Sequence, residues 1–418
     1  MKKVLAILFG LLLLAPATGE LWRIPLFGFD LLPSDFLIPL VFAVWLIYKI
    51  HSDRKVRLGR VGKAMLLFLF VLFATYLINF FRFDTHEMTM AGAYLCRFVM
   101  YIVIAFIAFD LLNRDEKYWL RILVGGMAAS MVLISLLGFL QLRYFSSFLD
   151  LGMHLQGWDP HIGRLLSTWF DPNFAGGYLA FILGITIAMA LYFRFHKNRR
   201  WFLAMSSISF VGLIAAYLTY SRSSYLALLT VLGILALFKS RKLIVVTFVV
   251  VILGFSLSGR VQERFMDAWG SARVLFGIDV QQTIDPTTQL RLWSWDFARE
   301  IISDHPFAGI GFNRYKYEIN TRGHGLLTDH ASGGSDSSLL TIWATTGVFG
   351  LLTYLAVGFV AAVCAFKRIL KKTDFRSYLS SGLLAGFGGM MLHSVFVNSL
   401  LFPLIMVYLY AGIGLLDE

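Results

Sequence analysis

The sequence has few charged residues and very little cysteine. Charged residues make up 15% of its 418 residues, against about 25% in soluble domains. This shortage excludes a soluble globular enzyme and a disordered chain. The two cysteines, Cys96 and Cys364, lie in or beside apolar stretches and give no redox signal. A secreted module held together by disulfides is therefore excluded as well.

Hydrophobic residues make up 58% of the chain, and the mean hydropathy is +0.71. They gather in long runs, whereas the strands of a β-barrel alternate apolar and polar residues. A membrane-spanning helix needs about 20 apolar residues, so we predict an all-α polytopic membrane protein, in contact with membrane lipid, with about 12 transmembrane helices. The runs are 4–18, 36–50, 64–82, 91–112, 119–141, 173–193, 201–219, 223–238, 243–258, 338–366, 377–398 and 402–416.

The first run is short, with Lys2 and Lys3 before it and Ala15-Pro16-Ala17 after it. A cleaved signal peptide shows the same pattern. Because only a short polar stretch separates this run from the next, we expect a helix that is retained.

Lysine and arginine in the short loops indicate which helix ends face the cytoplasm. They are concentrated in the loops 49–63, 194–200, 239–242 and 367–376, which all fall on one side in an alternating count. The opposite side is acidic or balanced. We therefore predict that both termini lie in the cytoplasm. The net charge of +12 follows from this topology and from anionic lipid, so no nucleic-acid partner is expected.

The order of the runs divides the chain into three parts. Residues 1–258 carry transmembrane helices one to nine, 259–337 form a large extracytoplasmic loop, and 338–418 carry helices ten to twelve. The loop is predicted to be partly helical, because Leu290, Trp293 and Phe297 recur at helical spacing within 290–302. The dipeptide at 305–306, His-Pro, ends this pattern.

Two arginines on the predicted outer face are candidates for binding an anion. Arg222 lies at a tight junction between two apolar runs, and Arg291 opens the helical pattern of the loop. The planar fork of an arginine suits a phosphate group. Two plainer interpretations stay open, namely that Arg222 snorkels to lipid headgroups and that Arg291 is a solvated helix residue.

Three further polar residues are candidates for substrate binding. Arg164 comes shortly before the turn Asp171-Pro172-Asn173, which leads into a run. Asn173 either takes part in binding or caps that helix. Arg97 lies inside a run, where a charge is costly and usually faces the bundle interior. For Arg97 we favour an ion pair that orders the bundle.

The candidate general bases are Asp336, just before the tenth run, and His330, six residues earlier. A carboxylate at this place is also favoured by the dipole of the following helix, and a histidine in the loop can simply be exposed. The sequence has no closely spaced Cys and His ligands, no P-loop and no GxSxG motif. Arginines with one acid on the outer face suit a lipid substrate that carries a diphosphate, without a metal or other cofactor.

Five short motifs follow one another along the chain. They are Ser167-Thr168-Trp169-Phe170-Asp171-Pro172-Asn173-Phe174, Ser221-Arg222-Ser223, Arg291-Leu292-Trp293, His305-Pro306-Phe307-Ala308-Gly309-Ile310-Gly311-Phe312, and Asp336-Ser337-Ser338-Leu339-Leu340 ahead of Thr346-Gly347-Val348-Phe349-Gly350. In this order, and with about twelve runs and a large late loop, the sequence resembles the O-antigen ligase and polysaccharide polymerase superfamily of bacterial membrane glycosyltransferases. The resemblance covers nearly the whole chain.

This resemblance implies roles for three of the residues. In ligases of the family, two outer-face arginines bind the diphosphate of an undecaprenyl-linked glycan, and they correspond to Arg222 and Arg291. A histidine followed by an asparagine deprotonates the acceptor. Counting back from Gly347, Asp336 and Ser337 occupy these two positions. An aspartate here departs from the ligase pattern, so ligase and polymerase both stay open.

The implied reaction is an inverting displacement without a metal, on the outer face of the bacterial cytoplasmic (inner) membrane. Asp336 or His330 takes the proton of a hydroxyl on an acceptor glycan or glycolipid, while arginines hold the leaving diphosphate. Trp293 and Tyr315 are candidate sugar-stacking residues, although aromatics at helical spacing more often pack. The alternative is a multi-span transporter or a flippase for lipid-linked glycan. Two features argue against it. The layout of nine helices, a loop and three helices is asymmetric, and charged residues are scarce inside the runs.

Overall fold

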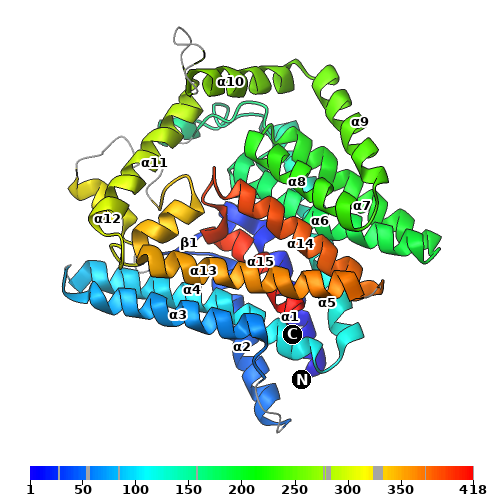
Figure 1. The fold of residues 1–418 in the computed structure, drawn as a ribbon, viewed down its shortest axis with the longest axis horizontal. Coiled ribbons are helices and arrows are strands. Elements are labelled where there is room, and N and C mark those ends of the chain that lie inside the picture. The colour runs from blue at the N-terminus through cyan, green and yellow to red at the C-terminus, as the bar shows by residue number, and fades with distance from the viewer. Residues whose placement is uncertain are drawn as a thin grey trace.

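The computed structural model describes the chain except residues 27–28, 53–56, 83–84, 157–158, 276–277, 279–283, 323–332, 372 and 418. The described part is almost entirely helical (Figure 1). Its α-helices are α1 (Lys2–Leu14), α2 (Pro33–Ile50), α3 (Arg60–Ile78), α4 (Thr85–Leu112), α5 (Glu116–Tyr144), α6 (Pro172–Phe195), α7 (Arg199–Leu218), α8 (Arg222–Phe238), α9 (Lys242–Leu257), α10 (Gly259–Leu275), α11 (Pro286–Asp304), α12 (Tyr315–Thr321), α13 (Ser338–Lys371), α14 (Phe375–His393) and α15 (Pro403–Leu416).

Short elements connect these helices. The 3₁₀ helices are η1 (Ala15–Trp22), η2 (Phe80–Arg82), η3 (Met153–Gln156), η4 (Ser167–Trp169) and η6 (Ser399–Leu401). The strands β1 (Ile24–Leu26) and β2 (Phe29–Leu31) form a small antiparallel hairpin in which Ile24 lies opposite Leu31.

Each of the twelve apolar runs lies mostly in a helix, although the run 377–398 continues beyond the end of α14, and the predicted all-helical fold is confirmed. Eight helices of the described residues are long and apolar enough to cross a membrane. Two more, α8 and α15, are apolar but shorter, and α9 forms a pair with α10 that bends by 102°. The protein is thus a membrane protein by its helices, while the number of twelve spans stays a prediction.

Helix α6 lies at the centre of the bundle and packs against α14, α7 and α8. Its contact with α14 is made by glycines. A Cβ atom on Gly184 would lie 2.7 Å from the carbonyl oxygen of Gly382, and one on Gly382 would lie 2.6 Å from the oxygen of Gly184. Small residues at such crossings let two membrane helices approach closely enough for backbone packing. Helices α13 and α15 pack in the same bundle against α3 and α4.

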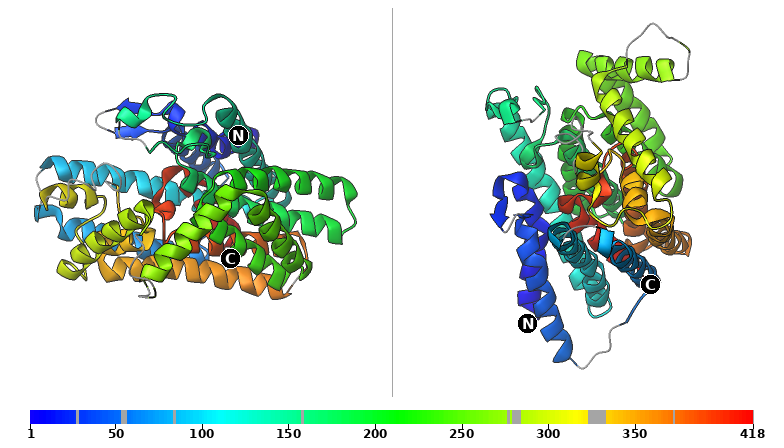
Figure 2. Two further views of the ribbon diagram at one scale, coloured as in Figure 1. Left: turned by 90° about the horizontal axis from the view of Figure 1, so that it is seen from above. Right: turned by 90° about the vertical axis from the view of Figure 1, so that its left-hand side faces the viewer.

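Helices α9 to α12 form the edge of the molecule in Figure 1, with α10 crossing between α9 and α11. The predicted helix at 290–302 is confirmed within α11, and His305 is its C-terminal cap. Helices α11 and α12 share a small core with α13, formed by residues that include Phe297, Ile301 and Ile319. The two chain ends lie at the opposite end of the molecule from α10 (Figures 1 and 2). The division at 258 and 337, and the side of the membrane on which each part lies, stay predictions.

The segment before α12 is joined to α13 by backbone hydrogen bonds. The N–H groups of Ile310 and Gly311 donate to the carbonyls of Ala344 and Thr345, at 3.0 and 2.9 Å. Helix α13 is interrupted at Gly347, which has φ 68°. A side chain at Gly347 would collide with the carbonyl of Phe307, so glycine is required here. These contacts fix α11 and α12 against the start of α13, where Asp336 lies.

Candidate active site

A cavity of about 1030 Å³ opens where the predicted functional segments meet. Its wall includes residues of the loop before α6, the start of α8, α10, α11, the segment before α13 and the loop around η6. Six predicted site residues line it, namely Arg97, Arg164, Asn173, Arg222, Arg291 and Asp336. Segments that are far apart in the sequence are thus brought to one place.

Arg222 is the first residue of α8, and Ser221 caps this helix by accepting a hydrogen bond from the backbone of Ser224. The guanidinium donates two hydrogen bonds to the carboxylate of Asp285, at 3.0 and 3.1 Å. Arg222 therefore forms a paired, largely buried cation at the cavity wall, which the interpretation as a lipid-snorkelling residue did not anticipate. This pair ties α8 to α11.

Asp285 has a second role as the N-cap of α11, where it accepts a hydrogen bond from the backbone N–H of Thr288 at 3.2 Å. The hydroxyl of Ser271 on α10 also donates to it, at 2.9 Å. Burial acts to raise the pKa of the Asp285 carboxyl, but hydrogen bonds from Arg222 and Thr288 outweigh burial and hold this pKa below its usual range. One carboxylate thus fixes α8, α10 and α11 beside the cavity.

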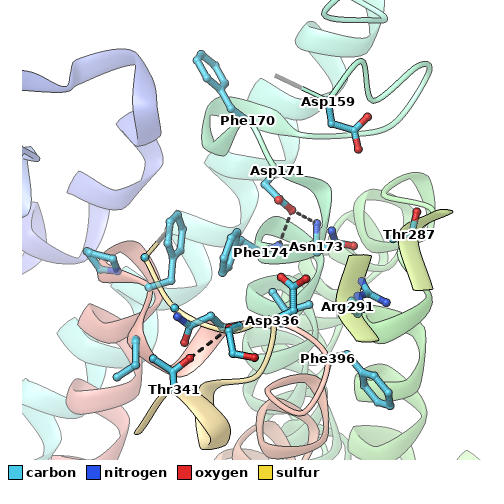
Figure 3. A pocket seen from close by; sticks show the side chains of 18 of the residues that line it. Asp159, Phe170, Asp171, Asn173, Phe174, Thr287, Arg291, Asp336, Thr341 and Phe396 are labelled. Carbon is cyan, nitrogen blue, oxygen red and sulfur yellow. Dashed lines mark hydrogen bonds between the residues drawn. The ribbon is translucent and has the colours of Figure 1, made fainter. Parts of the chain in front are cut away.

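Arg291 lies six residues after Asp285 on α11 and lines the same cavity. In the described part of the chain, no hydrogen bond or ion pair engages its guanidinium, which leaves its donors facing the cavity. Burial lowers the pKa of Arg291, while the nearby Asp336 carboxylate acts in the opposite direction. Figure 3 shows the side chains of Arg291 and Asp336 in the same part of the cavity.

Asp336 is held in place by α11. Its backbone N–H donates to the hydroxyl of Ser294 at 2.9 Å, and Ser294 lies three residues after Arg291 on the same helix face. The neighbouring Ser335 is fully buried and its hydroxyl donates to the Ser294 carbonyl at 3.3 Å. The cation and the acid are therefore positioned by the same turn of α11.

Asn173 does not cap α6, contrary to one of the two predicted roles. The cap is Asp171, whose carboxylate accepts hydrogen bonds from the backbone N–H groups of Asn173 and Phe174, at 2.6 and 3.2 Å. The reason is local, since Pro172 takes the first helical position and leaves the residue before it as the cap. The Asn173 side chain instead accepts hydrogen bonds from Ser221 at 2.8 Å and from Arg164 at 3.4 Å.

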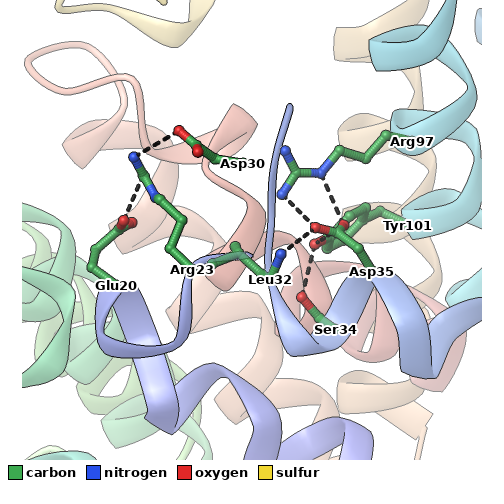
Figure 4. Close-up of polar contacts among 8 residues, drawn as sticks. All are labelled: Glu20, Arg23, Asp30, Leu32, Ser34, Asp35, Arg97 and Tyr101. Carbon is green, nitrogen blue, oxygen red and sulfur yellow. Dashed lines mark hydrogen bonds and ion pairs between the residues drawn. The ribbon is translucent and has the colours of Figure 1, made fainter. Parts of the chain in front are cut away.

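The ion pair expected for Arg97 is present. Its guanidinium donates two hydrogen bonds to Asp35 of α2, at 2.7 and 2.9 Å (Figure 4). The hydroxyl of Tyr101 donates to the same carboxylate at 3.0 Å and shares a hydrogen bond with Ser34. The network links α2 to α4, and Arg97 also borders the cavity.

The two predicted sugar-stacking residues do not line the cavity, so this expectation needs correction. Tyr315 is 1% exposed and packs edge to face on Phe297 in the core shared by α11, α12 and α13. Trp293 is 46% exposed but is not among the cavity residues. Tyr315 is thus a packing residue of α12. Trp293 lies on a face of α11 that does not border the cavity. His330 lies outside the described residues.

Sequence reasoning missed other members of the site. Asp285 was overlooked, although an aspartate before Pro286 is a recognisable helix start. Arg260 and Arg264 were also overlooked, although their spacing places them on one face of α10. The aromatic pair of Phe174 and Phe402, stacked at 4.1 Å between ring centroids, had no local signal because its members lie on distant segments.

One comparison with known proteins gave a match. A family model described as O-antigen ligase matches residues 207–355, a range that contains Arg222, Asp285, Arg291 and Asp336. The comparison with curated proteins gave no match. Residues 207–355 are therefore similar to the O-antigen ligase family, and this match supports the O-antigen ligase and polymerase superfamily that the motifs indicated.

Proposed function

We propose that this chain is a membrane glycosyltransferase that transfers or polymerises an undecaprenyl-diphosphate-linked glycan onto a hydroxyl of an acceptor sugar. The family match supports a membrane enzyme of the O-antigen ligase and polymerase type, which uses a lipid-linked glycan and an acceptor. It does not favour the alternative of a transporter or flippase. The observation that carries the proposal is that Arg222, Arg291 and Asp336 line one cavity.

The cavity is large enough to hold part of such a substrate, for example the diphosphate and the sugar next to it. Its volume of about 1030 Å³ is at the upper end of the range of roughly 300–1,000 Å³ that holds drug-sized ligands. The wall combines several arginines with a group of aromatic side chains around the η6 loop, including Phe174, Phe396 and Phe402. Charged groups suit a diphosphate, and apolar rings suit the faces of sugars or the first isoprene units of a lipid.

The two arginines contribute differently to holding the diphosphate. Arg291 has guanidinium donors that face the cavity, so it is our candidate for direct hydrogen bonds to the phosphate oxygens. Arg222 already uses two donors on Asp285. We infer that Arg222 acts mainly through its fixed charge and its remaining edge. Fixed cations of this kind stabilise the negative charge that develops on a leaving group.

Asp336 is our candidate for the general base. Its carboxylate takes the proton from the acceptor hydroxyl as that oxygen attacks the anomeric carbon. The bond between the anomeric carbon and the diphosphate oxygen breaks, and the lipid diphosphate leaves with the electron pair. A single displacement from the opposite face inverts the anomeric configuration. His330 remains the competing base. The chemistry is proposed to take place on the outer face of the bacterial cytoplasmic membrane, because lysine- and arginine-rich loops favour the cytoplasmic side and the site belongs to the opposite side in the alternating count.

The experiment is transfer in detergent solution by the purified full-length protein, with an undecaprenyl-diphosphate oligosaccharide as donor. Longer lipid-linked chains would identify a polymerase, and glycan on an added glycolipid would identify a ligase. Arg291→Gln and Arg222→Gln should each lower the initial rate by about 100-fold or more, as expected for groups that stabilise the transition state.

The matched control is Arg299→Gln, an exposed arginine on α11 whose side chain is 76% exposed and does not line the cavity. This variant should keep the wild-type rate. If the wild-type protein transfers glycan and both cavity variants keep its rate, the roles given to these arginines are wrong. If no glycosidic bond forms with any donor and acceptor pair while vesicles show movement of the lipid-linked glycan, the transferase proposal itself fails.

A further inference from the structure

A second group of arginines lines the cavity, apart from Arg222 and Arg291. It consists of Arg164 in the loop before α6 and of Arg260 and Arg264 on α10. The proposed reaction at the diphosphate uses neither Arg260 nor Arg264. Three cations on one wall need a reason, because like charges repel and are costly when partly buried.

Two members of this group are fixed by uncharged acceptors. Arg164 donates from Nε to the carbonyl of Thr219 at 2.9 Å and is only 8% exposed. Arg260 donates to the carbonyls of Gly163, at 3.1 Å, and Ile162. Its guanidinium also lies over the ring of Tyr220, 4.6 Å from the centroid. Neutral carbonyls and an aromatic face hold these side chains in position but do not cancel their charge.

The third member, Arg264, lines the cavity without a hydrogen bond or an ion pair to any residue that the structure describes. The helix that carries it is anchored on both sides of it. Arg260 binds the loop before α6, and Ser271 donates to Asp285 at 2.9 Å. Arg260, Arg264 and Ser271 lie on one face of α10, because they are spaced by four and seven residues.

The opposite face of α10 is apolar and exposed, with Phe265, Met266 and Trp269 between 54% and 58% exposed. A rotation of the helix would therefore bring these side chains into the cavity and remove Arg264 from it. The contacts of Arg260 and Ser271 oppose such a rotation. Arg264 is thus presented to the cavity by the packing of the whole helix.

Two acidic groups on the same wall, Asp171 and Asp159, attract Arg164 electrostatically, but neither forms an ion pair with it among the described residues. Asp171 caps α6, and Asp159 lies 3.4 Å from the ring of His161. Glu263 is next to Arg264 in sequence but does not line the cavity. Burial and the charge of Arg264 lower the pKa of Arg164 to about 10, even though Asp171 and Asp159 act in the opposite direction. An incoming anion would relieve this unfavourable arrangement.

We propose that Arg164, Arg260 and Arg264 form a second anion subsite, which binds a carboxylate or phosphate group carried by the glycan itself. The inference rests on the proposed function and deepens it, because it specifies an acidic glycan as substrate. Arg291 holds the diphosphate that leaves, whereas this subsite holds an anionic group that stays on the sugar chain. Arg264 supplies the open donors, and the two fixed arginines supply charge.

The test compares two undecaprenyl-diphosphate oligosaccharides that differ only in one sugar, a uronic acid in one and its neutral counterpart in the other. The wild-type protein should favour the acidic donor in kcat/KM by about tenfold or more, as for one charge-assisted hydrogen bond. Arg264→Gln should bring this ratio close to one. The matched control Arg299→Gln should keep the wild-type ratio. Equal use of both donors by the wild-type protein, or an unchanged ratio in Arg264→Gln, would overturn the inference.

A binding experiment separates this inference from the proposed function, because it requires no transfer. Isothermal titration of the purified full-length protein, in a detergent without anionic lipid, compares trigalacturonate with neutral galactotriose. Tighter binding of the acid, lost in Arg264→Gln, supports the subsite even if no donor is transferred. Equal binding of both by the wild-type protein contradicts it. If phosphatidylglycerol added to the micelles displaces the acid, the subsite belongs to a lipid headgroup and its assignment to the glycan is wrong.

Discussion

Replacing Asp285 with asparagine removes the negative charge that holds Arg222 but leaves an amide oxygen in nearly the same place. Asparagine caps helices as well as aspartate does, so the start of α11 should persist. The side chains of the pair are 16% and 13% exposed. An exposed pair contributes about 0–1 kcal/mol, whereas removing one partner of a buried pair costs about 3–5 kcal/mol. We therefore expect Asp285→Asn to lower the free energy of unfolding by about 2 kcal/mol.

The pair is isolated by a double-mutant cycle with Arg222→Gln, Asp285→Asn and the combined variant. The measurement is thermal unfolding in detergent micelles, followed by tryptophan fluorescence. Once one partner is replaced, replacing the other should lower the free energy of unfolding much less than it does in the wild-type protein. The coupling energy should exceed about 1 kcal/mol, as for groups in direct contact. Purely additive shifts of the two single variants would refute the pairing.

The difference in unfolding free energy between the wild-type protein and Asp285→Asn should also depend on pH, which provides an independent check. A carboxyl with a pKa that is lowered in the folded protein contributes stability above its unfolded pKa, about 3.9 for aspartate, and loses it as the pH falls through the folded value. The Asp285 pKa is lowered in this way. The stability difference between the wild-type protein and Asp285→Asn should therefore be constant from pH 5 to 8 and shrink only below about pH 4. A difference that already shrinks between pH 7 and 5 would contradict this reasoning.

Three further predictions concern the supports of the site. Ser294→Ala removes the acceptor for the backbone N–H of Asp336. It should lower kcat more than it raises KM and lower the free energy of unfolding by about 1 kcal/mol. Steady-state kinetics with the lipid-linked donor measures the first effect, and an unchanged kcat would contradict it. Gly382→Leu places a side chain against the backbone at Gly184 and should prevent stable accumulation in the membrane, measured by immunoblot against Ala385→Gly as control. Asp35→Asn leaves the arginine of α4 with an uncharged partner and should lower the free energy of unfolding by about 3 kcal/mol, and a melting curve identical to that of the wild-type protein would refute this.

The helices could be predicted because their signal is local. Lipid offers no hydrogen-bond partners, so each apolar run must satisfy its backbone within a helix. The predicted helix at 290–302 rested likewise on local spacing and lies within α11. The bend of 102° between α9 and α10 was not predicted, because it depends on how α10 binds α11 and the loop before α6. Hydropathy alone places the end of α9 but does not determine the direction of α10.

The candidate site could be predicted only as a set of residue types. Arg222, Arg291 and Asp336 were recognisable because charge is scarce in this sequence and because they lie in short motifs. The partner of Arg222 is 63 residues away, and no local pattern indicates such a pairing. The burial of Tyr315 follows from the packing of three helices, which spacing alone does not reveal. The role of Asp171 as the N-cap of α6 could have been predicted from the sequence, since a proline follows it directly.

The most direct test of the proposed function is the release of undecaprenyl diphosphate, measured against glycosidic bonds formed, for the wild-type protein and Asp336→Asn. The matched control is Asp296→Asn on α11, whose side chain is 70% exposed. The wild-type protein and the control should release one lipid diphosphate for each bond formed. Asp336→Asn should do so about 100-fold more slowly, within the range for loss of a general base. A wild-type rate in Asp336→Asn, or diphosphate release without bond formation, would contradict the proposed function.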